Sequence, residues 1–291
     1  MARICVFAFA ALHCVVSPVW EVCYLPDYQP VGALRLLGAK WWVPLMTPTI
    51  AIGFQSLTIG LLLAVAAGIG PYHRLAPLAC IALTVSEGML RGWSGIHHEA
   101  LILLLLSYLI CGFPAADALT LVGQRNRTRH ANEGLTYRAA MVSASLIFSF
   151  TYLMVAARRL AAGGLQIFLD DTILCAVAIR DTELGNAGGL GIWACESVFL
   201  AWLLRVGFPI VTFFELMSPL FVFSRRFRWL WISVMIPFHV GTGILMGIWF
   251  PYNLALIPIL VAGWDPFRCS SSAQTNTKRL SKRPKPLSQA A

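Results

Sequence analysis

Long apolar stretches separated by short polar breaks run along almost the whole chain. They cover roughly residues 4–20, 48–69, 76–90, 98–113, 139–157, 192–222, 229–247 and 249–264. A helix needs about 20 apolar residues to cross the hydrocarbon core of a bilayer, with its backbone amides paired internally. The stretches are continuous, whereas the strands of a membrane barrel alternate apolar and polar residues. The pattern predicts an all-α, polytopic transmembrane bundle of about eight helices, within a range of about seven to nine.

Composition supports this class and adds a boundary near the C-terminus. Of the 291 residues, 58% are apolar and 12% are charged, and the mean hydropathy is +0.73. The apolar stretches extend over residues 1–267, which we interpret as one transmembrane domain. Residues 268–291 are rich in Ser, Lys, Arg, Pro and Gln and have little to bury, so a disordered basic tail is predicted there.

The positions of Arg and Lys predict the orientation. With eight crossings, most of these residues fall in alternate loops, at residues 125–129 and 225–228, and in the tail. The positive-inside rule then places both termini in the cytoplasm. Attraction to anionic lipids of the inner leaflet explains the net charge of +9, so binding of nucleic acid is not needed as an explanation.

Two features of the chain leave alternatives open. The short apolar stretch after Arg3 is typical both of a retained first helix, which we favour, and of a secretory signal peptide. The eight cysteines show no CxxC pair and no metal-ligand spacing, so no metal site is predicted. They are interpreted as packing residues, with one outer disulfide among Cys23, Cys175 and Cys195 as the alternative.

His239 lies in an apolar stretch, residues 229–261, that contains no other titratable or charged side chain except tyrosine. A polar side chain that faces hydrocarbon without a partner costs about 2 to 4 kcal/mol, so the imidazole must face protein or water. It is therefore a candidate functional residue, and a core histidine bonded to a neighbouring helix is the alternative. His13, in the first apolar stretch, is interpreted only as such a core histidine.

A group of ionisable residues surrounds the predicted connection between the third and fourth helices. Glu87 and Arg91 are one helical turn apart, and His97, His98 and Glu99 follow. The structural interpretation is an i, i+4 ion pair followed by an acidic helix start. The functional interpretation is an acid–base site at the outer membrane face, because the predicted topology puts this connection outside.

Arg158 and Arg159 end the fifth predicted helix on the same outer side. They are interpreted either as a pair that complements the helix dipole or as a clamp for an anion or oxyanion. Glu215 lies at membrane depth in the sixth helix, and Arg225 or Arg226 is its expected partner. Arg205, in the same helix, is expected to pair with a buried acid or histidine.

Four short motifs occur in an order that resembles a known family. They are Gly95-Ile-His97-His98-Glu99, Asp117 after Cys111-Gly-Phe-Pro, the segment from Thr151-Tyr152 to Arg158-Arg159, and the segment from Phe238-His239 to Phe250-Pro-Tyr-Asn253. Together they are similar to the HTTM family, the membrane domain shared with vitamin K-dependent gamma-glutamyl carboxylase and with many bacterial proteins. The resemblance covers about residues 1–265 and implies a multi-pass protein of the bacterial plasma membrane.

The resemblance also implies roles for particular residues. In the carboxylase, the domain oxygenates reduced vitamin K, and the base so formed deprotonates a peptide glutamate before carbon dioxide is added. His98 (or His97) and His239 match the family's histidines, and the family's catalytic lysine falls on Arg159. Arginine stays protonated at any accessible pH, so glutamate carboxylation is not expected of this chain.

Two functions follow as hypotheses, and the sequence does not decide whether the protein is an enzyme. The first is an HTTM-like enzyme that modifies or matures a lipid, quinone or peptide at the outer face. The second is a non-catalytic membrane protein that assembles with a partner chain. A transporter is disfavoured because no repeat halves are found. The candidate catalytic residues are His97, His98, Arg158, Arg159 and His239, the candidate substrate-binding residues are Glu87, Arg91, Tyr152 and Asn253, and a quinone-like molecule is the only cofactor suggested.

Overall fold

A computed structural model describes residues 2–24, 46–94, 100–113, 133–183 and 189–262, and within these ranges every regular element is helical. Its α-helices are α1 (Ala2–Val16), α4 (Pro48–Ala67), α5 (Tyr72–Ser94), α6 (Leu101–Cys111), α7 (Glu133–Gly163), α8 (Thr172–Glu183), α9 (Leu190–Glu196), α10 (Val198–Leu216), α11 (Leu220–Phe223), α12 (Arg225–Met246) and α13 (Pro251–Leu256). Shorter helical turns are η1 (Val19–Tyr24), η3 (Gln166–Phe168) and the π-helical η4 (Ile257–Ala262). The all-α prediction is confirmed for the described chain.

Five described helical segments are long and apolar enough to cross a membrane: Arg3–Tyr24, Pro48–Ala67, Arg138–Gly163, Val198–Leu216 and Arg225–Met246. Two shorter apolar segments, Leu101–Cys111 and Pro251–Val261, correspond to the predicted fourth and eighth crossings. The predicted third crossing is α5, which is long enough at 23 residues but less apolar. The structure is thus compatible with an integral membrane protein, whereas the count of about eight and the orientation stay predictions.

The predicted crossing at residues 192–222 is divided into three helices. The backbone of Ser197 is extended (φ −71°, ψ 117°), and its hydroxyl accepts a hydrogen bond from the Leu200 amide, so that α9 ends and α10 begins there. At the other end, the Ser218 hydroxyl donates to the carbonyls of Glu215 and Ser149. Local hydroxyl bonds satisfy the backbone at both breaks, which hydropathy does not register.

A similar break separates α1 from η1, and a side chain from α4 fills it. The side-chain oxygen of Gln55 accepts from the Val19 amide at 2.8 Å, and its amide group donates to the Cys14 carbonyl. Gln55 is buried. Because free backbone groups are costly in an apolar interior, one glutamine lets the first crossing change from an α-helix to a 3₁₀ turn.

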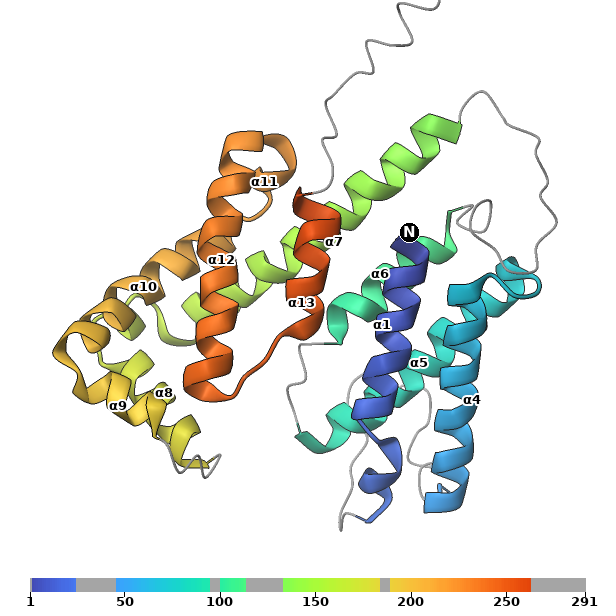
Figure 1. Ribbon diagram of the computed structural model, residues 1–291, viewed down its shortest axis with the longest axis horizontal. Helices are drawn as coiled ribbons and strands as arrows, with labels where there is room; N and C mark the ends of the chain where they lie inside the picture. The colour runs from blue at the N-terminus through green and yellow to red at the C-terminus, as the bar shows by residue number, and fades with distance from the viewer. Residues whose placement is uncertain (1, 25–45, 95–99, 114–132, 184–188, 263–291) are drawn as a thin grey trace, which may run out of the picture.

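The helices form two groups with α13 between them (Figure 1). The blue to green helices α1, α4, α5 and α6 lie on one side, and α8 to α12 lie on the other, where α10 and α11 pack against the long helix α7. The η4 turn after α13 packs on α7 and α12. The Ser145 hydroxyl of α7 donates to the Leu260 carbonyl at 2.9 Å, which holds this last segment in the bundle.

Aromatic side chains fill the core where α7, α11 and α12 meet. The Trp231 ring lies 5.1 Å from Tyr152, 6.2 Å from Phe148 and 4.9 Å from Phe221, centroid to centroid. The Trp231 indole also donates to the Phe214 carbonyl at 3.1 Å. The buried rings fix α12 against α7, and this contact positions the polar residues described next.

Candidate functional site

His239 bonds a tyrosine of another helix. Its Nε2 lies 2.7 Å from the hydroxyl of Tyr152, which joins α12 to α7. Both side chains are buried, with His239 2% exposed. The structure thus brings together two candidate residues that lie 87 positions apart in the sequence.

A third candidate, Asn253, joins this cluster and favours one arrangement of its protons. The Asn253 side chain of α13 makes a hydrogen bond to Tyr152. With the Asn253 amide group donating to the tyrosine oxygen, the Tyr152 hydroxyl donates to Nε2 of His239, and the neutral imidazole carries its proton on Nδ1. This Nδ1 atom is buried and has no hydrogen-bond partner among the described residues.

The segment between α12 and α13 places one aromatic ring, that of Phe250, on His239. Gly247 ends α12 in the left-handed conformation (φ 61°), which turns the chain back toward the helix. The indole of Trp249 then lies so close to Gly243 that a Cβ at this position would come within 2.5 Å of it. The Phe250 ring follows, with its centroid 4.9 Å from that of His239. The imidazole therefore has an apolar cover on this side.

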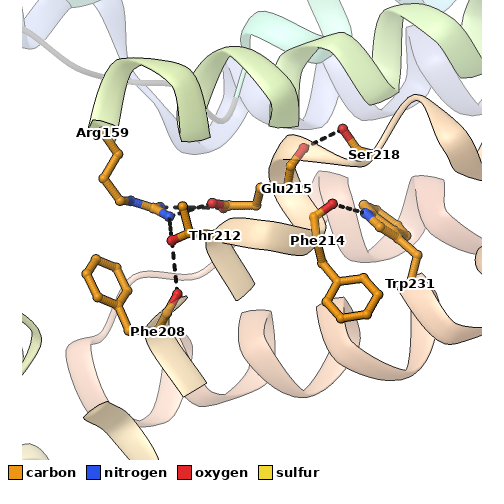
Figure 2. A network of polar contacts seen from close by, with 7 residues as sticks. All are labelled: Arg159, Phe208, Thr212, Phe214, Glu215, Ser218 and Trp231. Carbon is orange, nitrogen blue, oxygen red and sulfur yellow. Dashed lines mark hydrogen bonds and ion pairs between the residues drawn. The ribbon is translucent and has the colours of Figure 1, made fainter. Parts of the chain in front are cut away.

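Arg159 is held by an acid of α10 (Figure 2). Its Nη1 donates to Glu215 Oε2 at 2.5 Å and to Thr212 Oγ1 at 2.6 Å, and its guanidinium lies 5.1 Å from the centre of the Phe208 ring. Glu215 was expected to pair with Arg225 or Arg226, and that expectation is wrong. Ser149 of α7 meets Ser218 just after α10, and Arg159 meets Thr212 and Glu215, so the last part of α7 lies beside the C-terminal half of α10.

Glu87 also has a partner that spacing does not suggest. Its Oε1 lies 2.7 Å from Nε2 of His13, and Nδ1 of the same imidazole lies 3.2 Å from the Tyr252 hydroxyl. All three side chains are buried. His13 is therefore a bonded core histidine, as expected, whereas Glu87 faces α1. Sequence analysis missed this contact, although a histidine and a glutamate in the apolar parts of two helices were a signal that the two groups meet.

Other candidates lie apart from these clusters or outside the described residues. Residues 95–99, which include His97 and His98, and the side chain of Arg91 are outside them. Arg158 is exposed next to its paired neighbour. In the described parts of the chain, the cysteines, with Cys23, Cys175 and Cys195 among them, are free, and no group of three metal-ligating side chains occurs.

Arg205 pairs at the surface rather than with a buried acid. Its Nε donates to Asp171 Oδ1 at 2.7 Å, and its Nη2 donates to Oδ2 at 3.0 Å. This hydrogen bond lowers the pKa of the Asp171 carboxyl, which is exposed in the turn before α8. The contact joins that turn to α10 and has no connection with the buried clusters.

The chain matches no known family model, no curated protein sequence and no solved structure. The chemistry of the site therefore has to be argued from its own residues. A phenol bonded to an imidazole, with the second imidazole nitrogen vacant and an aromatic cover above, can orient one hydrogen-bond acceptor and exchange a proton with it.

Proposed function

We propose that the protein is a membrane enzyme that performs acid–base chemistry on a lipid, quinone or peptide, with His239 and Tyr152 at its centre. The observation that carries the proposal is the vacant Nδ1 atom of His239. A buried N–H group without a partner costs about 1 to 3 kcal/mol. A bound molecule that offers an oxygen acceptor at this atom removes the penalty.

The residues around His239 support a definite proton path. His239 donates its Nδ1 proton to a carbonyl, quinone or similar oxygen of the substrate, so that the Nδ1–H bond breaks and an O–H bond forms. The imidazole then takes the Tyr152 hydroxyl proton at Nε2. The charge left on the tyrosine oxygen is stabilised by the Asn253 amide, which already bonds it.

Arg159 has a supporting role in this proposal. Its guanidinium is occupied by Glu215 and Thr212, so it compensates a buried carboxylate and is not available as a substrate clamp. An arginine engaged in this way cannot start vitamin K chemistry as the family's lysine does. We propose that the protein is an HTTM-like membrane protein of the bacterial plasma membrane that does not carboxylate glutamate.

Analysis of co-purified small molecules tests this function. The full chain is purified in mild detergent, and its organic extract is compared by mass spectrometry with extracts of His239→Gln and Tyr152→Phe. The exposed Asp171→Asn variant is the matched control. We expect a lipophilic molecule with a carbonyl or hydroxyl oxygen in the wild type and the control, and at least a tenfold loss from His239→Gln.

Equal amounts of the molecule in all four proteins would contradict the proposal. Recovery of a stoichiometric partner chain, with no enriched small molecule, would support instead the second hypothesis of a non-catalytic assembly protein. In that case the vacant Nδ1 atom faces a residue of the partner.

A further inference from the structure

We propose that Glu87, His13 and Tyr252 form a second buried acid–base unit, and that the first turn of α13 joins it to the Tyr152–His239 pair as one site. The inference rests on the proposed function, because it assigns positioning residues to the same site. It also concerns a physical coupling that can be measured without any substrate.

The geometry of the second unit is that of a carboxylate–imidazole–phenol line. Glu87 Oε1 is 2.7 Å from His13 Nε2, and His13 Nδ1 is 3.2 Å from the Tyr252 hydroxyl. A carboxylate at Nε2 keeps the proton on that nitrogen, so that Nδ1 is left as an acceptor for the tyrosine proton. If Tyr252 gives up its proton, its O–H bond breaks, an Nδ1–H bond forms, and Glu87 stabilises the imidazolium.

The Glu87–His13–Tyr252 line lies in the interior of the protein and not at its surface. His13 is 4%, Glu87 2% and Tyr252 4% exposed, and the three come from α1, α5 and α13. A carboxylate in an apolar interior is tolerated when it is paired, and a packed hydrophobic trio would serve the fold equally well. An acid, a base and a phenol brought together from three helices therefore indicate proton chemistry.

The first turn of α13 contacts both units. Phe250 packs its ring on His239, Tyr252 bonds His13, and Asn253 bonds Tyr152. These three residues lie within one turn, in which the ring of Pro251 fixes the first helical φ angle. A change in the Glu87–His13–Tyr252 line that shifts Tyr252 must shift Asn253 and Phe250, and with them the environment of His239.

The two units differ in one respect that assigns their roles. In the Glu87–His13–Tyr252 unit, Nε2 of His13 lies 2.7 Å from a charged partner, Glu87 Oε1, whereas Nδ1 of His239 has no described partner of either kind. The vacant imidazole is the one that meets the substrate. Glu87, His13 and Tyr252 are positioning residues, which set the placement of the α13 turn and hold a proton close to it.

Nitrogen NMR of the histidine side chains tests the coupling. The full chain is labelled with ¹⁵N-histidine, and the imidazole signals of His13 and His239 are assigned with the His13→Gln and His239→Gln variants. Glu87→Gln removes the carboxylate charge but keeps its shape, and Asp171→Asn is the control. We expect Glu87→Gln to shift the nitrogen signals of both His13 and His239, and the control to shift neither.

A change confined to His13 would overturn the inference. If Glu87→Gln does not fold, Tyr252→Phe removes a single hydroxyl and is judged by the same criterion at His239. Loss of the bound molecule in the extraction experiment bears on the proposed function alone, so failure of the coupling and failure of the function remain distinguishable.

Discussion

At the scale of single residues, two buried acids are paired with basic side chains of other helices. Arg159 binds Glu215, and His13 binds Glu87, in each case between different helices. Replacing one partner leaves the other charge buried and unpaired, which is far more costly than losing the pair as a whole. The buried pairs should therefore respond differently to single and double substitution.

We expect Arg159→Met to lower the free energy of unfolding by about 2 to 4 kcal/mol, because Glu215 then stays buried without its cation. The double variant with Glu215→Met should regain much of this loss. Thermal unfolding in detergent measures both effects. Arg205→Met, which breaks the exposed pair with Asp171, is the control and should leave the unfolding temperature almost unchanged. Equal losses in the single and double variants would contradict this account.

At the scale of elements, a close contact at Gly243 determines how the segment after α12 packs on this helix. The Trp249 indole fills the space beside Gly243, whereas nothing lies within 4 Å of a Cβ at Gly241 in the same helix. The two glycines therefore provide a matched pair of substitutions. Only Gly243 contacts the segment that carries Phe250 onto His239.

We expect Gly243→Ala to displace Trp249 and destabilise the protein by about 1 to 3 kcal/mol, as overpacking of a close contact does. Gly241→Ala should be neutral or slightly stabilising, because alanine favours helix and meets no neighbour. The unfolding temperature and the tryptophan emission of the two variants measure the difference. A similar response of both variants would show that the 247–250 segment does not pack on α12 as described.

Hydropathy predicted where helices such as α4 lie along the chain. It did not predict which side chains contact one another between helices. The stretch that became α4 was predicted within two residues at each end, because a mostly apolar run of twenty residues between Thr47 and Gly68 is long enough to cross a bilayer as a helix. His239 was singled out because burial of a polar ring requires a partner. Its partner Tyr152 lies 87 residues away, and pairing at such a separation depends on how helices pack, which periodicity does not encode.

At the scale of the whole molecule, large apolar side chains cover the outer surface. Phe199, Trp202, Phe213, Trp229 and Leu230 are all more than half exposed. Such a surface suits lipid and would cause aggregation in water. The orientation within the lipid depends on the basic residues of the loops.

A reporter protein fused after Ala291 tests the predicted orientation. With the C-terminus in the cytoplasm, a fluorescent reporter that matures only in that compartment should fluoresce, and a phosphatase active only outside should be inactive. The opposite pair of results would contradict the predicted orientation. It would place the Arg159 end of α7 on the cytoplasmic side of the membrane. Fusions after Gly163 provide the complementary point on the other side.

The close glycine contacts of α12 also restrict which substitutions can accumulate at positions in and around this helix. A Cβ at Gly191 would meet the Leu245 carbonyl at 2.5 Å, and one at Gly243 would meet the Trp249 ring. Neither position tolerates a larger residue unless its neighbour changes as well. Distant descendants of this chain should therefore keep a small residue at 191, and should vary 243 and 249 together, even where their polar residues have diverged beyond recognition.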